Sequence, residues 1–445
     1  MGETIQDRLD PVTRAEVHQR LAEALESTGG PADELARHRA ASGDTRGAAA
    51  AFATAAAIRL DRFADNEARQ LASDGIAIGA DEPEVRSTLL EVRAETYARQ
   101  GDFEAARRDL RDALVDATSR PARSRLLTRM AALTAGVEDM VRAGELADLA
   151  TAEAADDPGA RARAVYVRAL VDMNLDLHDA AEARFEEALQ LFTTAGDTAG
   201  VADILDARAM SAFGFGQITE GIERFERVAK LFADNGNLLR IVTPRSTRGH
   251  GLLFAGRAEE GLLETADALE LARSLGYAEG EAMVLWHHSE VLAGCGRAEE
   301  ARSVATAGVE LARRVQHRGW TASTLCGLGV VEIARGDLEA AATAFADSLA
   351  LTEHLVMFKC WAHARLAGVL LAQDRLVEAE AHVRWALESG PGLLGQYEAR
   401  LARCELAVRR GDDDAETLVD EALRLARAGG HVLSADRLAE LGRQV

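Results

Sequence analysis

A fixed interval between four glycines constrains the fold of this chain more than any other feature. Gly216, Gly256, Gly296 and Gly336 follow one another at intervals of about 40 residues. A period of about 40 residues is typical of stacked repeats, each of which buries its apolar face only against its neighbours. We therefore expect each unit to hold two helices, helix A and helix B, joined by a hinge. Further hinges are expected at 42–43, Gly101, Glu138, Asp176, Asp374 and 410–411, with a short extra unit starting at Phe63.

Small side chains recur at two fixed distances after each hinge. Nineteen of the twenty residues that lie five or twelve positions after the ten hinges are Ala, Gly or Ser. A third small set, which includes Gly249 and Ala367, lies seven positions before the hinge, on helix A. Positions seven apart share one face of a helix, and small side chains there let neighbouring helices approach closely. The pattern predicts an all-α, right-handed superhelical solenoid of about 22 helices.

Composition and charge exclude several classes of protein. Only 4% of the residues are aromatic and seven are proline, which favours helices over sheets. The net charge of −22 argues against direct nucleic-acid binding, which needs Lys and Arg against phosphate. The four cysteines form no CxxC pair, and residues 47–58, the most apolar run, are too short for a membrane span. We expect a reduced, cytoplasmic protein without a membrane segment.

The order of small helix A residue, hinge and Ala-rich helix B resembles the tetratricopeptide repeat. The usual unit of that family is shorter, at about 34 residues. Longer units are similar to those in the sensor regions of large ATP-dependent LuxR-type bacterial regulators and their cyclase-linked relatives. Residues 14–26, 34–38 and 43–44 resemble the stretch that joins the ATPase module to the repeats in that group. The resemblance implies a tetratricopeptide-like solenoid and a sensing role.

The modules that accompany such sensors are missing from this sequence. The only lysines, Lys230 and Lys359, do not follow glycine, so the Gly-Lys of a phosphate-binding P-loop is absent. The last repeat is followed directly by residues 441–445, which leaves no space for a DNA-binding helix-turn-helix. We expect either an excised sensor region or a stand-alone protein derived from one.

No catalytic, metal or cofactor motif stands out. The sequence has no GxSxG, HExxH or glycine-rich phosphate loop. His287 and Glu290 share a helix face but supply only two of the three protein ligands that zinc needs, so we expect them to be packing or groove residues. Cys360 and His363 are expected to pack within a helix rather than to form a nucleophilic pair. We predict a protein that is not an enzyme and needs no cofactor.

Helix A of a tetratricopeptide array lines the concave groove, and the resemblance places the groove residues 13, 10, 6 and 3 positions before the hinge. Aromatic and polar side chains on these lines favour a ligand or peptide site over plain helix packing. The predicted binding residues are Tyr166, Asp206, Met210, Phe213, Arg248, His250, Trp286, Glu290 and Trp361.

An arginine ladder lies eight positions before the hinges, at Arg168, Arg208 and Arg248, and is continued by His288. Stacked units would align these side chains. They either form ion pairs with the many Asp and Glu residues, which we favour, or bind an anionic ligand through guanidinium forks.

The sequence thus predicts a sensor or interaction module that binds a small effector, a peptide or a partner protein in its groove, as part of transcriptional or signalling regulation. The alternative is an adaptor or scaffold that holds partner proteins together, and a homo-oligomer is compatible with both. We expect residues 1–62 to form a helical junction or N-terminal cap. Residues 63–445 should form the array, closed by a capping helix near Val432 to Leu441.

Overall fold

The structure is a computed structural model that describes residues 10–61, 64–79, 82–99, 102–136, 139–154, 157–175, 177–234, 236–315, 317–352, 356–389 and 394–445. These residues form 23 α-helices and no β-strand, which confirms the predicted all-α repeat fold. The chain divides into two compact units, up to Arg168 and from Ala169 onward.

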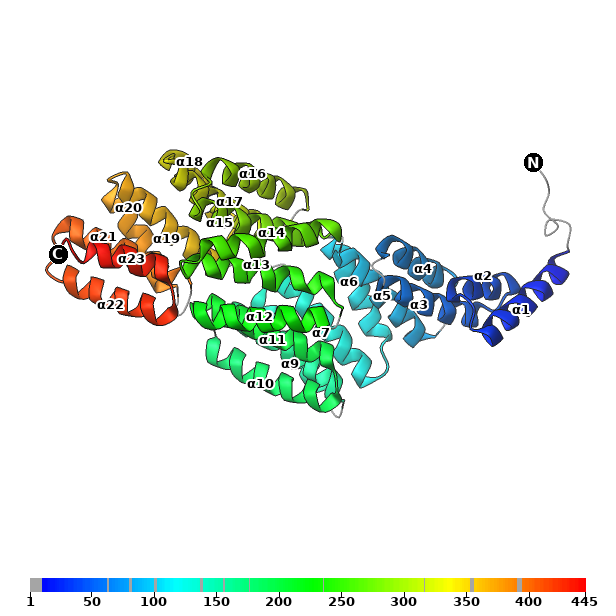
Figure 1. Ribbon diagram of the computed structural model, residues 1–445. Coiled ribbons are helices and arrows are strands. Elements are labelled where there is room, and N and C mark those ends of the chain that lie inside the picture. Colours follow the sequence, from blue (N-terminus) through cyan, green and yellow to red (C-terminus); the bar gives the residue numbers. More distant parts are fainter. Residues whose placement is uncertain are drawn as a thin grey trace. The chain divides into compact units, whose positions relative to one another are not determined.

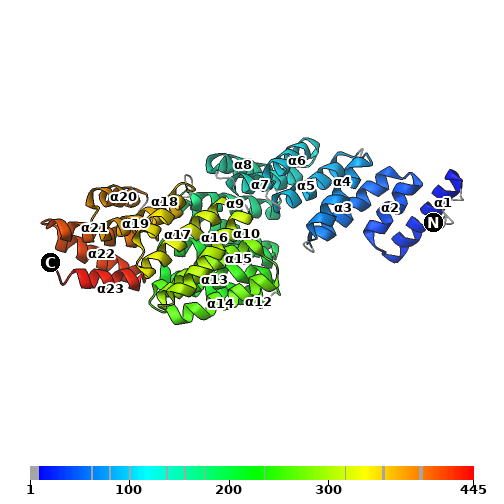
Figure 2. The same cartoon turned by 90° about the horizontal axis from the view of Figure 1, so that it is seen from above.

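The helices of the first unit follow one another in chain order in Figure 2. They are α1 (Pro11–Thr28), α2 (Ala32–Ser42), α3 (Thr45–Asp61), α4 (Asp65–Ala77), α5 (Pro83–Arg99), α6 (Phe103–Asp116), α7 (Arg120–Gly136) and α8 (Met140–Ala154). The boundary between the units falls within α9 (Pro158–Asn174).

The second unit contains the remaining helices (Figure 1). They are α10 (His178–Ala195), α11 (Thr198–Gly214), α12 (Ile218–Asp234), α13 (Leu238–Phe254), α14 (Ala258–Ser274), α15 (Ala278–Gly294), α16 (Ala298–Arg314), α17 (Arg318–Arg335), α18 (Leu338–Leu349), α19 (Val356–Ala372), α20 (Leu376–Glu388), α21 (Gln396–Arg410), α22 (Ala415–Gly429) and α23 (Val432–Leu441).

The predicted hinges are turns between antiparallel helices. Gly216, Gly256, Gly296 and Gly336 have φ between 74° and 82°, the left-handed region that glycine adopts without strain. Gly43 and Gly411 are also left-handed, with φ of 88° and 71°, and Asp374 is the one non-glycine hinge with positive φ among the described residues, at 60°. The expected hinges at Gly101, Glu138 and Asp176, and the unit start at Phe63, lie outside the described residues. The boundary at 62/63 therefore stays a prediction.

A second series of glycines explains the length of the repeat. Gly196, Gly236 and Gly276 are also left-handed, and they end helix B of each unit. The two series alternate, each lying midway between members of the other, and all six helices from α11 to α16 are 17 residues long. The longer period therefore comes from longer helices and not from longer loops.

The small residues lie where the register predicts. All twenty positions five and twelve places after the hinges are buried. One such contact joins α13 to α14, where a Cβ added to Gly261 would lie 2.5 Å from the carbonyl oxygen of Gly249. Glycine at both positions is what lets the two backbones meet.

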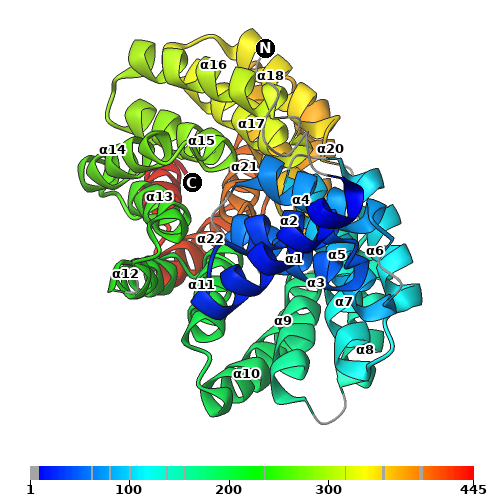
Figure 3. The same cartoon turned by 90° about the vertical axis from the view of Figure 1, so that its right-hand side faces the viewer.

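The second unit closes on itself through its last helices. Tyr397 on α21 donates its hydroxyl to the carbonyl oxygen of Gly216, at 2.8 Å, and the Leu394 N–H donates to Gly214 at 2.7 Å. α23, which matches the predicted capping helix, packs against α13 and α21. In Figure 3 the red ribbon at the C-terminus lies next to α13.

Candidate functional site

The A helices of the second unit bring five rings together, which we call the inner cluster: Phe213, His250, Phe254, Trp286 and Trp361. The centroid of the His250 ring lies 4.6 Å from that of Phe254, 5.3 Å from Trp286 and 5.7 Å from Trp361. Their side chains come from α11, α13, α15 and α19 and are at most 5% exposed. Rings at these separations contribute packing energy beyond the area that they bury.

Glu290 is the charged centre of this cluster. Its carboxylate accepts hydrogen bonds from Trp286 Nε1 at 2.6 Å and from His250 Nε2 at 3.0 Å. A carboxylate only accepts, so the proton of His250 lies on Nε2. Burial alone would raise the pKa of Glu290, but Arg365 and His250 outweigh it and hold this pKa well below its usual value. Glu290 is therefore an ionised carboxylate in the interior.

Arg365 on α19 is shared by two carboxylates. Its two Nη atoms donate to Glu290 at 2.8 and 2.9 Å, and its Nε donates to Glu398 on α21 at 3.0 Å. The guanidinium carbon lies 4.6 Å from the centroid of the Trp361 ring. Burial raises the pKa of Glu398, and Arg365 only partly opposes this effect. One guanidinium is thus shared by two carboxylates, of which Glu290 is buried and Glu398 is partly exposed.

A cavity of about 550 Å³, which we call the inner cavity, lies beside this network. Glu290, Arg365 and Glu398 form its charged end, and the walls come from α13, α15, α17, α18, α19, α21 and α23. Most of the wall is apolar, from Leu253, Phe254, Val330, Ile333, Leu338, Val369, Leu401 and Leu433. An apolar cavity of this size with a few convergent charged groups has the character of a ligand site.

The predicted site residues divide into three sets. Phe213, His250, Trp286, Glu290 and Trp361 meet in or beside the inner cluster, but of these only Glu290 lines the inner cavity. Met210 packs at the edge of the same core. Asp206 pairs with Arg240 and Arg248 with Glu264, whereas Tyr166 belongs to the first unit. Their role in binding stays a prediction.

The arginine ladder forms ion pairs. Arg168 contacts Asp148, Arg208 contacts Glu182 and Glu186, and Arg248 contacts Glu226 and Glu264, all on neighbouring B helices. His288 bonds to Thr265. These contacts agree with the ion-pair interpretation of the ladder.

The other motifs contact their neighbours in the core. His287 bonds to Ser246 at 2.8 Å, and burial lowers its pKa well below the usual range. Cys360 contacts the carbonyl oxygen of Ala386, while the ring of His363 contacts His382. Within the part of the chain that the structure describes, no group of three His, Cys, Asp or Glu side chains could hold a metal ion.

Sequence reasoning missed Arg365, Glu398 and most of the cavity wall. Part of the wall lies on the predicted groove positions, because Leu253, Val330 and Ile333 stand three or six residues before their hinges and line the cavity. The same spacing, counted from the left-handed residues Asp374 and Gly411, leads to Gly368, Glu398 and Leu401, which also line it. Arg365 lies off these lines, four positions after Trp361 on the same helix.

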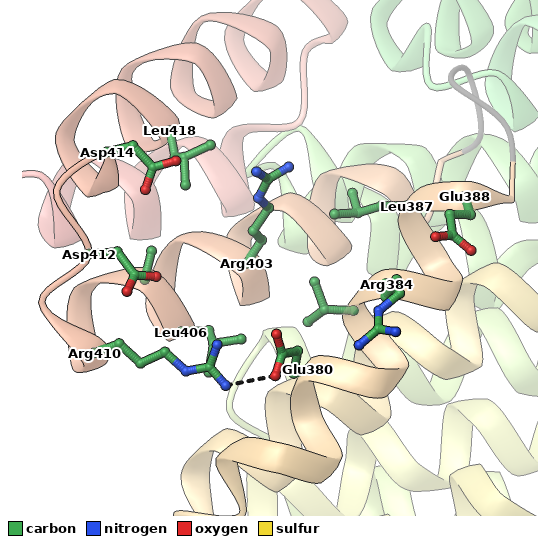
Figure 4. A pocket seen from close by; sticks show the side chains of 12 residues that line it. Glu380, Arg384, Leu387, Glu388, Arg403, Leu406, Arg410, Asp412, Asp414 and Leu418 are labelled. Carbon is green, nitrogen blue, oxygen red and sulfur yellow. Dashed lines mark hydrogen bonds and ion pairs between the residues drawn. The ribbon is translucent and has the colours of Figure 1, made fainter.

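A second hollow, of about 440 Å³, lies between α20, α21 and α22 (Figure 4). Figure 4 shows Arg403 extending between the helices and Arg410 paired with Glu380, at 2.8 Å. Three arginines and four carboxylates line it, so it lacks a dominant charge. It is a weaker candidate than the inner cavity.

None of the described helices combines the length and apolar character that crossing a membrane requires. Residues 280–354, from α15 to α18, match the family model of the tetratricopeptide repeat. No curated protein matches the sequence of the chain.

Solved structures with the same fold are distant in sequence. A Rap protein complexed with competence and sporulation factor aligns with a TM-score of 0.52 at 14% identity, over 82% of this chain and 100% of its own. The apo form of the quorum sensor NprR from B. thuringiensis aligns with a TM-score of 0.53 at 15% identity, over 76% of this chain and 97% of its own. Aspartyl phosphate phosphatase F from Bacillus subtilis aligns with a TM-score of 0.51 at 11% identity, over 64% of this chain and 75% of its own. Similarity at this level concerns the fold, and function has to be argued from the site. The described helices form an array of tetratricopeptide-type repeats.

Proposed function

We propose that this protein is a non-enzymatic, cytoplasmic sensor that binds a small effector or the end of a peptide in its inner cavity as part of transcriptional or signalling regulation. The single observation that carries the proposal is the cavity itself, where apolar walls meet a buried charged network. Binding there would change the packing of α23 against α13 and α21, and so alter the surface offered to a partner.

The structural similarities support a binding role. One similar structure is a complex with competence and sporulation factor, and another is a quorum sensor. The repeats here have the same fold and contain the inner cavity. In a repeat array, small changes of packing between units add up along the stack, which suits a sensor.

Gly368 offers a direct test. It lies on α19 and lines the cavity, and a Cβ added there meets no atom within 4 Å. We expect Gly368→Leu to occupy part of the cavity and narrow it while the fold stays intact, and Gly368→Ala, the matched control, to change the cavity little. Native mass spectrometry of the purified chain should show a bound molecule in the wild type and in Gly368→Ala, and less of it in Gly368→Leu.

The thermal midpoint of each variant checks that the fold is preserved. A molecule retained equally by the leucine variant would place the ligand elsewhere and contradict the proposal. Purified chain that carries no molecule and binds none from a metabolite extract would also count against a sensor.

The hollow between α20, α21 and α22 favours the second candidate, an adaptor. It is open at the surface, and the side chains of Arg384 and Arg403 are exposed within it. Charge reversal by Arg403→Glu should weaken capture of a partner protein if the chain is an adaptor, and should leave binding in the inner cavity unchanged if it is a sensor.

A further inference from the structure

We infer that the inner cavity takes an amphiphilic cation, a ligand with an apolar body and one ammonium or guanidinium group. The inference rests on the proposed function, because it names the class of ligand for the same cavity.

The charges that line the cavity do not balance. Four carboxylates, from Glu290, Glu398, Glu405 and Asp436, face two guanidiniums, from Arg365 and Arg437. The Arg437–Glu405 pair at the rim, at 2.6 Å, and the Arg365–Glu290 pair cancel within themselves. Glu398 shares Arg365 with Glu290, and Asp436 is exposed at the rim, so the carboxylates of the lining outnumber its guanidiniums by two.

Glu398 is the less satisfied of the two inner carboxylates. Glu290 accepts four hydrogen bonds, from Trp286, His250 and both Nη atoms of Arg365. Glu398 has only Arg365 Nε as its donor among the described hydrogen bonds, and its side chain is 21% exposed. The raised pKa of Glu398 reflects the same shortage of compensating charge. A cationic group at this carboxylate would supply what Arg365 does not.

The shape and polarity of the cavity decide what else the ligand carries. The aliphatic walls and the volume of about 550 Å³ suit an apolar body of drug-like or smaller size. A purely apolar ligand would remove Glu398 from water while the carboxylate still shares its Arg365 counterion with Glu290, and burying a carboxylate with so little compensation is costly. An anionic ligand would add a negative charge to a lining in which carboxylates already outnumber guanidiniums. An amphiphilic cation avoids both penalties, because its apolar body contacts the walls and its charged group pairs with Glu398.

Three probes with the same chain length and different charge test this inference: n-octylammonium, n-octanol and n-octanoate, each titrated calorimetrically into the full chain. We expect n-octylammonium to bind at least tenfold more tightly than the other two. Glu398→Gln should reduce that preference about tenfold, and Gly368→Leu should weaken the binding of n-octylammonium. Glu380→Gln is the matched control, because it removes the same charge from the second hollow.

Each outcome decides between the two proposals. If n-octanol binds as tightly as n-octylammonium, or n-octanoate binds best, the cation preference is wrong while a ligand cavity remains. If Glu380→Gln weakens n-octylammonium as much as Glu398→Gln, the effect is the overall net charge and the inference fails. If no probe binds, the inference fails too, and the sensor role is then judged by the Gly368 variants and co-purified molecules alone.

Discussion

Arg365 and Glu290 lie 75 residues apart in the sequence, yet two hydrogen bonds of 2.8 and 2.9 Å join both guanidinium Nη atoms to both carboxylate oxygens. The pair links α19 to α15, and both side chains are at most 6% exposed. Such a pair is weak as a source of stability, because desolvation offsets the attraction, but each partner depends strongly on the other.

Removing one partner of this pair should therefore destabilise the fold strongly. We expect Arg365→Met to lower the free energy of unfolding by about 3–5 kcal/mol, since Glu290 would stay buried without its counterion. The double variant Glu290→Gln/Arg365→Met should recover much of the loss. Arg437→Met, which breaks the exposed pair with Glu405, should cost under about 1 kcal/mol. Urea unfolding followed by circular dichroism measures all three, and equal losses for Arg365→Met and Arg437→Met would contradict the argument.

The repeat architecture could be predicted because it follows from local rules. A glycine hinge needs only its own φ, and small residues seven apart need only one helix face. The hinges and the small residues can both be recognised in the sequence, and Gly216, Gly256, Gly296 and Gly336 are left-handed as expected. The second glycine series, at Gly196, Gly236 and Gly276, has the same period and is left-handed as well.

The candidate site could be predicted only in part. The groove positions include His250, Trp286 and Glu290, which hydrogen bonds join in the structure because residues one unit apart stack side by side. The closure of the unit was not predictable in this way. The bond from Tyr397 to Gly216 spans 181 residues, and no periodic pattern within one repeat encodes it. For that reason Trp286 and Trp361 are packed inside the fold, and truncating either to Ala would reduce stability as well as any binding.

The contact between α13 and α14 gives a second prediction. Gly261→Ala places a Cβ 2.5 Å from the Gly249 carbonyl oxygen, which belongs to a backbone that cannot move easily. We expect a loss of about 1–3 kcal/mol, as for other overpacked contacts. Gly368→Ala is the matched control, because its Cβ meets nothing within 4 Å and should stabilise α19 by up to about 1 kcal/mol. Thermal midpoints that move in the same direction would show that the close approach is not real.

The hinges give a third prediction. Asp374 has φ of 60°, which costs an L side chain about 1 kcal/mol or more, and its only described ion pair is a 3.8 Å contact with Arg409 that leaves the Asp side chain 86% exposed. Asp374→Gly should therefore raise the free energy of unfolding by about 1 kcal/mol. Gly336→Ala should lower it by a similar amount, since the added Cβ meets no atom within 4 Å and only the backbone angle matters. Denaturant midpoints shifted the opposite way would contradict a left-handed hinge.

Asp206 gives a prediction with a defined pH window. Burial raises its pKa from 3.8 to about 6, although Arg240 opposes the shift, and its Oδ1 is buried without a hydrogen-bond partner. The folded state therefore holds the proton more tightly than the unfolded state, so stability is lost as the pH rises from about 4 to 6. Asp206→Asn should be neutral below pH 4 and should stabilise the protein by about 1–2 kcal/mol above pH 6, after allowance for the partly exposed side chain.

The neighbouring carboxylate is the control for this variant. Asp203 lies 2.8 Å from the same Arg240, closer than Asp206 at 3.3 Å, so Asp203→Asn removes the better ion pair and should bring no gain at high pH. Thermal unfolding of the wild type and both variants between pH 4 and 8 separates the two cases. A gain for Asp206→Asn that is already complete at pH 4 would mean that the benefit does not come from removing a buried charge. The raised pKa would then not be its cause.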